Sequence, residues 1–112
     1  MATAIASEAA RLGELGLSDE DLARATGAAR STARAWLSDR GGSPTGKRAE
    51  RLIELLALVE RLEQLMEADY IPIWLRKPVP VLDDDKPLDV IGRGGYRRVA
   101  RLISELEGTI AS

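Results

Sequence analysis

Apolar residues recur at helical spacing along most of the chain, and the longest such run covers residues 47–69. Its apolar positions are Leu52, Ile53, Leu55, Leu56, Leu58, Val59, Leu62, Leu65 and Met66. Spacings of three and four residues predict one long helix, but the apolar face is wider than the roughly 100° stripe that a surface helix buries. We therefore expect N-terminal helices to cover part of this face. The C-terminal segment, a second copy of the chain, or both would cover the rest.

Three shorter helices are predicted before this run, over residues 3–13, 19–26 and 28–38. Ser18 has the character of an N-cap, because the acid Asp21 follows three residues later as in a capping box. Gly27 should end the second helix, since glycine tolerates the left-handed conformation that stops a helix. The glycines, Ser43 and Pro44 of residues 41–46 predict a turn before the long helix.

The C-terminal part predicts shorter elements. A short helix is expected over residues 70–77, then irregular structure at Pro78 and Pro80, an acidic turn over residues 83–85 and a single helical turn over residues 87–91. The chain is therefore predicted to be all-α. It should form a helical bundle in residues 1–66 and a smaller helical unit in residues 67–112.

A last helix is predicted over residues 96–107. Its apolar residues, at positions i, i+3, i+4 and i+7, are Val99, Leu102, Ile103 and Leu106. Gly108 follows at the C′ position that ends many helices. Residues 109–112 should then form a tail beyond the helix.

Composition narrows the possible functions. A chain of 112 residues has the size of one small domain, and it contains no cysteine and no histidine. Disulfides, thiol nucleophiles, Cys/His zinc sites and imidazole bases are thereby excluded. Glu105 and Glu107 point to different faces of their helix, so they cannot act as paired acid and base. We expect no enzyme, with no catalytic, cofactor-binding or metal-binding residue. With no secretory or membrane segment in the sequence, we expect a cytoplasmic protein without a membrane partner.

A helix-turn-helix is indicated by the spacing of Ala23, Gly27, Ala33 and Trp36. Ala23 is small where the two helices touch, and Ala33 and Trp36 anchor the second helix. The outward positions of that helix are Ala29, Arg30, Ser31, Arg34 and Ser38, and the last four could bind DNA. Residues 28–48 carry five cations against one acid, Asp39, a local balance of +4 that suits phosphates. A helical hairpin with a solvated basic face would have the same spacing.

Two features near the last helix call for an explanation. Residues 92–95 (GRGG) precede a helix, but the Lys-Ser/Thr pair of a nucleotide-binding loop is missing, so flexible turn glycines are the better interpretation. Tyr96, Arg97, Arg98 and Arg101 crowd the beginning of the helix, where cations are mildly unfavourable. They indicate an acidic or phosphate-bearing partner, or serve solubility alone.

Several motifs lie along the C-terminal part: W-L-x-x-P (residues 74–78), K-P-L-D-V-I (86–91), G-G-Y-x-R-V-x-x-L-I (94–103) and E-G (107–108). Together they resemble the toxin-binding domain of the Xre/MbcA/ParS family of antitoxins. Val79 and Gly95 depart from the family, which often has Asn and Glu there, and the acidic turn at 83–85 is unusual. The resemblance covers nearly the whole chain and implies an Xre-like helix-turn-helix joined to a small helical toxin-binding domain.

The resemblance also implies partners and roles. The partner would be a RES-domain toxin of a type II toxin–antitoxin pair that degrades NAD, and the C-terminal end of the antitoxin would block its active site. Toxin-binding residues would be Tyr96, Arg97, Arg101, Glu105, Gly108, Thr109, Ile110, Ala111 and Ser112. Arg30, Ser31, Arg34 and Ser38 would face operator DNA, allowing the protein to repress its own operon. A homodimer and a larger hetero-oligomer with the toxin are expected.

An alternative is a phage-type helix-turn-helix repressor without a toxin partner. It would explain Arg30 and Arg34 but not the C-terminal motifs. A neighbouring reading frame for a RES-domain protein would favour the antitoxin.

Overall fold

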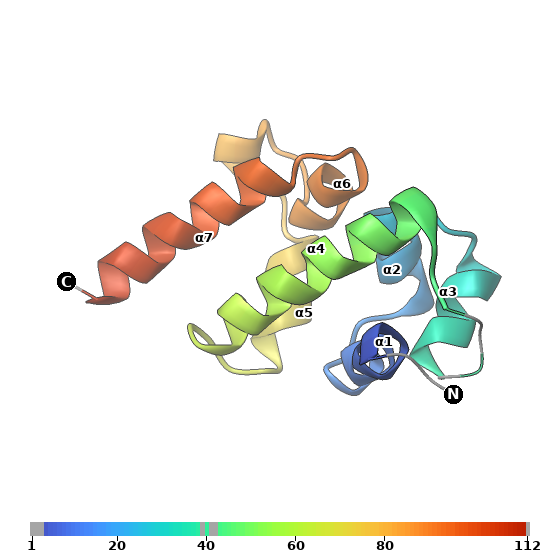
Figure 1. Ribbon diagram of the computed structural model, residues 1–112. Helices are drawn as coiled ribbons and strands as arrows, with labels where there is room; N and C mark the ends of the chain where they lie inside the picture. The colour runs from blue at the N-terminus through green and yellow to red at the C-terminus, as the bar shows by residue number, and fades with distance from the viewer. Residues whose placement is uncertain (1–3, 39, 41–42, 112) are drawn as a thin grey trace.

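The structure, a computed structural model, describes residues 4–38, 40 and 43–111, and it is all-α as predicted (Figure 1). The helices in chain order are α1 (Ala4–Glu14), α2 (Asp19–Thr26), α3 (Arg30–Leu37), α4 (Gly46–Glu63), α5 (Tyr70–Arg76), the 3-10 helix η1 (Pro80–Leu82), α6 (Pro87–Gly92) and α7 (Tyr96–Ala111). No helix in the described ranges is long and apolar enough to span a membrane.

Local chemistry sets the bounds of α2 as the sequence predicts. The Ser18 N–H donates to the Asp21 carboxylate at 2.8 Å, and the Asp21 N–H donates to the Ser18 hydroxyl oxygen at 3.2 Å, which completes a capping box. Gly27 ends the helix with φ 80°, a conformation that costs glycine little. The predicted N-cap and C-cap of α2 are both confirmed.

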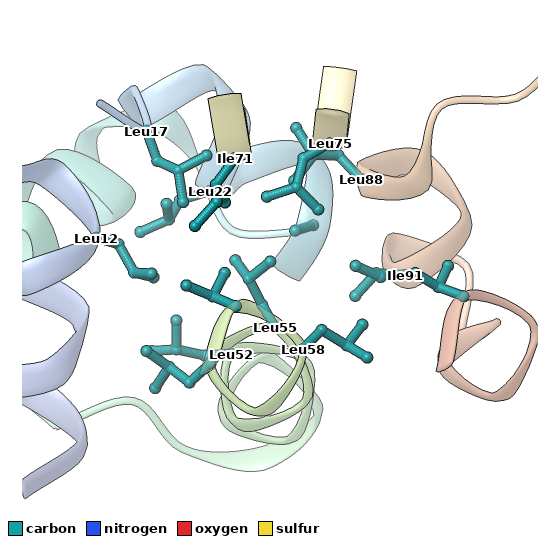
Figure 2. Close-up of a cluster of buried hydrophobic side chains, with 14 of the residues drawn as sticks. Leu12, Leu17, Leu22, Leu52, Leu55, Leu58, Ile71, Leu75, Leu88 and Ile91 are labelled. Atoms are coloured by element: carbon teal, nitrogen blue, oxygen red, sulfur yellow. The ribbon is translucent and has the colours of Figure 1, made fainter. Parts of the chain in front are cut away.

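The core surrounds α4, which lies across the middle of the molecule (Figure 1). Leu52, Leu55 and Leu58 are fully buried. Figure 2 shows them between Leu12 of α1 and Ile91 of α6. Helices α1 and α2 contact α4 from one part of the chain, and α5, α6 and α7 contact it from the other. The C-terminal segment therefore covers much of the wide apolar face, while Ile53 remains 47% exposed.

Buried residues from both predicted units belong to one hydrophobic cluster. Among the described residues, three ion pairs also join the units: Arg76 with Asp21, Arg24 with Asp89 and Arg61 with Glu107. At Gly92, α6 approaches α2 so closely that an added Cβ would overlap the carbonyl oxygen of Arg24. The predicted division at residue 66 falls in the turn between α4 and α5 and remains a prediction.

Two predicted bounds near the ends of long helices are wrong. Helix α4 ends at Glu63 rather than at residue 69. The N–H groups of Leu65 and Met66 turn back to the carbonyl of Leu62, at 2.9 and 3.1 Å. Both side chains still pack against the core from this turn, so the apolar pattern continues where the helix does not.

Helix α7 continues to Ala111, so Gly108 is not a C′ residue and residues 109–111 are not a tail. A glycine within a helix costs only about 1 kcal/mol relative to alanine, which does not suffice to end a helix held by other contacts. Helix α3 likewise begins at Arg30 rather than 28, because Ala29 is extended (φ −65°, ψ 151°). Ser112 lies outside the described residues.

Candidate functional site: the α3 and α7 surfaces

Helices α2 and α3 form the predicted helix-turn-helix. Ala33 is fully buried and Trp36 is 5% exposed, so both anchor α3 to the core. In the turn, the Thr26 hydroxyl donates to the Leu22 carbonyl at 2.6 Å and accepts from the Ala28 N–H at 3.2 Å. These contacts fix the angle between the two helices and leave the opposite side of α3 in solvent.

The exposed side of α3, here called the α3 surface, consists of Arg30, Ser31, Arg34 and Ser38, and the structure brings all four together. The Ser38 hydroxyl donates within its own helix, to the carbonyls of Arg34 and Ala35. Arg30 and Arg34 both pair with Asp19, the first residue of α2.

Sequence reasoning missed Asp19 as part of the α3 surface. Nothing in the local sequence indicates these contacts, because Asp19 lies 11 residues before Arg30 and 15 before Arg34. The hydrogen bond from Arg34 lowers the pKa of Asp19, with further lowering by Arg30 and an opposing effect of burial. The three side chains together carry a net charge of +1.

A polar cavity of about 450 Å³ adjoins the α3 surface. Ser31, Thr32 and Trp36 of α3 line one side, and Thr45 and Arg48 at the beginning of α4 line the other. The first turn of α4 contains no acid, and the Thr45 side chain forms no capping hydrogen bond there. Because a helix N-terminus is electropositive, the helix and Arg48 both favour a negatively charged group at this place.

The residues of α7 that are predicted to bind a toxin lie on two different sides of the helix. Arg97, Arg101 and Glu105 are exposed and, at a spacing of four residues, share a face; Gly108 and Thr109 are also exposed. Tyr96 instead packs partly buried against the core. We call Arg97, Arg101, Glu105 and the last turn the α7 surface.

Ile110 lies four residues after Leu106 and seven after Ile103, so it extends the apolar stripe of α7. Ile103 is fully buried, whereas Ile110 is 64% exposed. The C-terminal end of α7 lies at one extremity of the molecule (Figure 1). The helix therefore presents an apolar side chain beyond the part of the core that it covers. The side chain of Ala111 is not described.

Arg61 of α4 holds the distal half of α7 in place. Its guanidinium donates to both carboxylate oxygens of Glu107, at 2.6 and 3.1 Å, and to the hydroxyl of Ser104 at 2.9 Å. The hydrogen bond from Arg61 lowers the pKa of Glu107. Sequence reasoning considered Glu107 as an unsuitable acid–base partner and as part of the E-G motif, and it missed this contact, which spans 46 residues.

Residues 8–64 match the model of the family described as "Helix-turn-helix". The chain belongs to this helix-turn-helix family. Curated relatives include the mycobacterial cidal antitoxin MbcA of Mycobacterium bovis and of Mycobacterium tuberculosis, each 33% identical over 57 residues. That match covers 51% of this chain and spans 50% of each relative.

The fold also matches a chain in the crystal structure of the M. tuberculosis MbcT–MbcA toxin–antitoxin complex. The TM-score is 0.78 at 28% identity, and the match covers 95% of this chain and 96% of that one. Together with the helix-turn-helix match, these similarities confirm the predicted resemblance to antitoxins of the Xre/MbcA type.

Proposed function

We propose that this helix-turn-helix protein is the antitoxin of a type II toxin–antitoxin pair, and that its partner is a RES-domain, NAD-degrading toxin. One observation carries the proposal. The similarity to a chain of the MbcT–MbcA complex covers 95% of this chain, and so extends beyond the helix-turn-helix at residues 8–64 into α5–α7. A repressor without a toxin partner leaves that C-terminal similarity unexplained.

The α7 surface suits the blocking role. Within the described part of the chain, Arg97 and Arg101 form no ion pair, so their guanidinium groups are available to acids of a partner. Ile110 offers an exposed apolar group at the end of the same helix. Because Arg61 holds α7 through Glu107, the blocking element is the rigid end of a helix rather than an extended tail.

Inhibition of the toxin tests this role. The RES-domain protein encoded beside this chain is purified, and its consumption of NAD is titrated with wild type, with a truncation lacking residues 109–112, and with Ile110→Ser. In the proposed complex, Ile110 would be buried against the toxin, and truncation of a buried Ile typically costs about 2–5 kcal/mol. We therefore expect half-inhibition to require at least about tenfold more of either variant. Val81→Ser is the matched control, since Val81 is 63% exposed on η1.

Full inhibition by the truncated protein, with helicity unchanged by circular dichroism, would contradict blocking by the end of α7. If neither wild type nor variants inhibit or bind the RES-domain protein, the antitoxin assignment itself is wrong.

We further propose that the α3 surface binds operator DNA and that the protein represses its own operon as a homodimer. Arg30 and Arg34 are one helical turn apart and exposed, so both can reach one groove. For the dimer, a groove of about 320 Å³ between α1 and α4 is lined by Ile5, Ile53 and Leu56, and Ile53 is 47% exposed there. Ile53→Glu should shift the molecular mass in light scattering from dimer to monomer.

DNA binding is measured with a duplex of the protein's own promoter region. Arg34→Ala should weaken binding at least about fivefold, because it removes a cation facing the phosphates and bases. Arg93→Ala is the control, because Arg93 pairs with Asp85 away from α3. Unchanged affinity of Arg34→Ala would place the DNA contacts elsewhere.

A further inference from the structure

The most informative contact outside the proposed toxin surface is the carboxylate of Asp19. Its Oδ2 accepts from Nε of Arg34 at 3.0 Å and from Nη2 of the same residue at 2.8 Å. Its Oδ1 accepts from Nη2 of Arg30 at 3.2 Å. The Asp19 side chain is 13% exposed, whereas the side chains of Arg30 and Arg34 are 63% and 69% exposed. One largely covered acid on α2 thus holds two exposed cations on α3.

The pairing leaves a defined set of donors on Arg34. A guanidinium carries five N–H donors in one plane, and Asp19 takes one from Nε and one from Nη2. Of the three remaining N–H groups, one on Nη1 and one on Nη2 point outward and form the outer edge of the fork, whereas the second on Nη1 points back along the side chain. That edge matches the two acceptors O6 and N7 that guanine presents in the major groove, the commonest specific contact of arginine with DNA.

We propose that Asp19 is a positioning residue for base reading: it fixes Arg34 so that the outer guanidinium edge meets a guanine, with Arg30 held beside it. This inference rests on the proposed DNA-binding role of the α3 surface. A long side chain that is already held loses less conformational freedom on binding. Asp19 therefore favours the correct base more than it favours DNA in general.

Two other roles for Asp19 are less consistent with these contacts. Stabilising the N-terminus of α2 does not require Asp19, because Glu20 and Asp21 also lie in the first turn. Shielding the arginines from DNA would require covering them, yet both guanidinium side chains are more than 60% exposed. The carboxylate adds a negative charge near the DNA phosphates, which weakens general affinity rather than base discrimination.

The experiment compares general with specific affinity. Duplexes are selected from a randomised library by the full-length wild-type protein, and fluorescence anisotropy measures binding of the best duplex and of a scrambled duplex at one salt concentration. In Asp19→Asn we expect scrambled-duplex affinity to stay equal or rise, because one acid is lost. The ratio of selected to scrambled affinity should fall about tenfold, within the range for one bidentate base contact. Asp83→Asn, an equal charge change at a distant ion pair with Arg98, should leave the ratio unchanged.

A base-level probe identifies the contact. Replacing single guanines of the selected duplex with 7-deazaguanine removes N7. Wild type should lose affinity at one guanine in each half-site, whereas Asp19→Asn should be insensitive there. Arg34→Lys keeps the charge but cannot donate as a fork. It should lose discrimination to a similar extent, and the double variant Asp19→Asn/Arg34→Lys should lose no more than either single variant.

Each contrary result has a distinct meaning. Equal gains of Asp19→Asn on both duplexes would show that Asp19 shields the arginines, and a lower melting temperature with an unchanged ratio would show a purely structural role. Both overturn the inference while DNA binding stands. If wild type selects no sequence from the library, DNA reading by the α3 surface is wrong, and the role of Asp19 in it is wrong as well.

Discussion

The ion pair of Asp21 with Arg76 joins the helix-turn-helix to α5, and removing its charge should destabilise the whole fold. Arg76 donates three hydrogen bonds to the Asp21 carboxylate at 2.5–3.2 Å, and the Ser18 N–H donates a fourth. The Asp21 side chain is 6% exposed and that of Arg76 is 42% exposed. A hydrogen bond to a charged group contributes about 1.5–3 kcal/mol, and a helix cap about 1 kcal/mol.

We therefore expect Asp21→Asn to lower the free energy of unfolding by about 2–4 kcal/mol. The loss is smaller than for a fully buried pair, because Arg76 can regain water. The total stability of a domain is about 5–15 kcal/mol, so the change is large. Asp83→Asn removes the same charge from an exposed pair, and we expect a change within about 0.5 kcal/mol.

Urea denaturation followed by circular dichroism measures both variants, and an unchanged m value ensures that stability is being compared. Arg76→Met removes the guanidinium but keeps most of the stem, and the double variant completes a thermodynamic cycle. We expect a coupling free energy of about 1.5–3 kcal/mol. A loss below about 1 kcal/mol in Asp21→Asn, or a coupling near zero, would refute the reasoning that this pair holds the two parts together.

Three further predictions concern packing, α7 and pH. Gly92→Ala should destabilise by about 2 kcal/mol or more, measured as a lower urea midpoint, because its Cβ would overlap the Arg24 carbonyl. The control Gly108→Ala places a Cβ in open space and should stabilise by about 0.5–1 kcal/mol; equal effects of the two would contradict the close approach of α6 to α2. Glu107→Gln should accelerate hydrogen exchange of amides 104–111 while leaving α2 unchanged, since Arg61 then loses its charged partner. Exchange of amides 104–111 at the wild-type rate would contradict the role of Arg61 in holding α7. Burial raises the pKa of Asp21, but the hydrogen bonds from Arg76 and Ser18 together lower it by more, so that the net pKa lies below that of the free side chain. The ion pair therefore stabilises fully above the unfolded-state pKa of about 4, and this stability is lost as the pH falls through the folded-state pKa. Asp21→Asn should show a shallower acid transition, and identical pH profiles would refute this.

Features determined by neighbouring residues could be predicted from the sequence. The capping box of Ser18 and Asp21 and the left-handed Gly27 fix α2 within ten residues of chain, so both bounds of α2 were predictable. Trp36 and Ala33 follow the spacing of a helix-turn-helix, and both are buried. The exposed members of the α3 surface follow from the same periodicity.

Features that depend on distant partners could not be predicted in this way. Asp19 is an ordinary first-turn acid until α3 folds back beside it, and Arg61 meets Glu107 only because α7 lies along α4. Gly108 has the local character of a helix stop, yet the contacts of Glu107 and the hydrogen bond from the Thr109 hydroxyl to the Glu105 carbonyl continue the helix past it. Leu65 and Met66 have the right spacing for α4 but pack from a turn.

Because both parts of the chain share one hydrophobic core around α4, a single proteolytic cut between them would affect both parts. A protease that cuts the turn between Glu63 and Tyr70 would produce two fragments. Core side chains such as Leu55 in the first fragment and Ile91 in the second would then become exposed to water. Each fragment would lose the apolar contacts that the other supplies around α4 and would be destabilised by that loss. On the functions proposed here, one cut would therefore end inhibition of the toxin and silencing of the operon together, so the cell would regain transcription at the moment it lost protection.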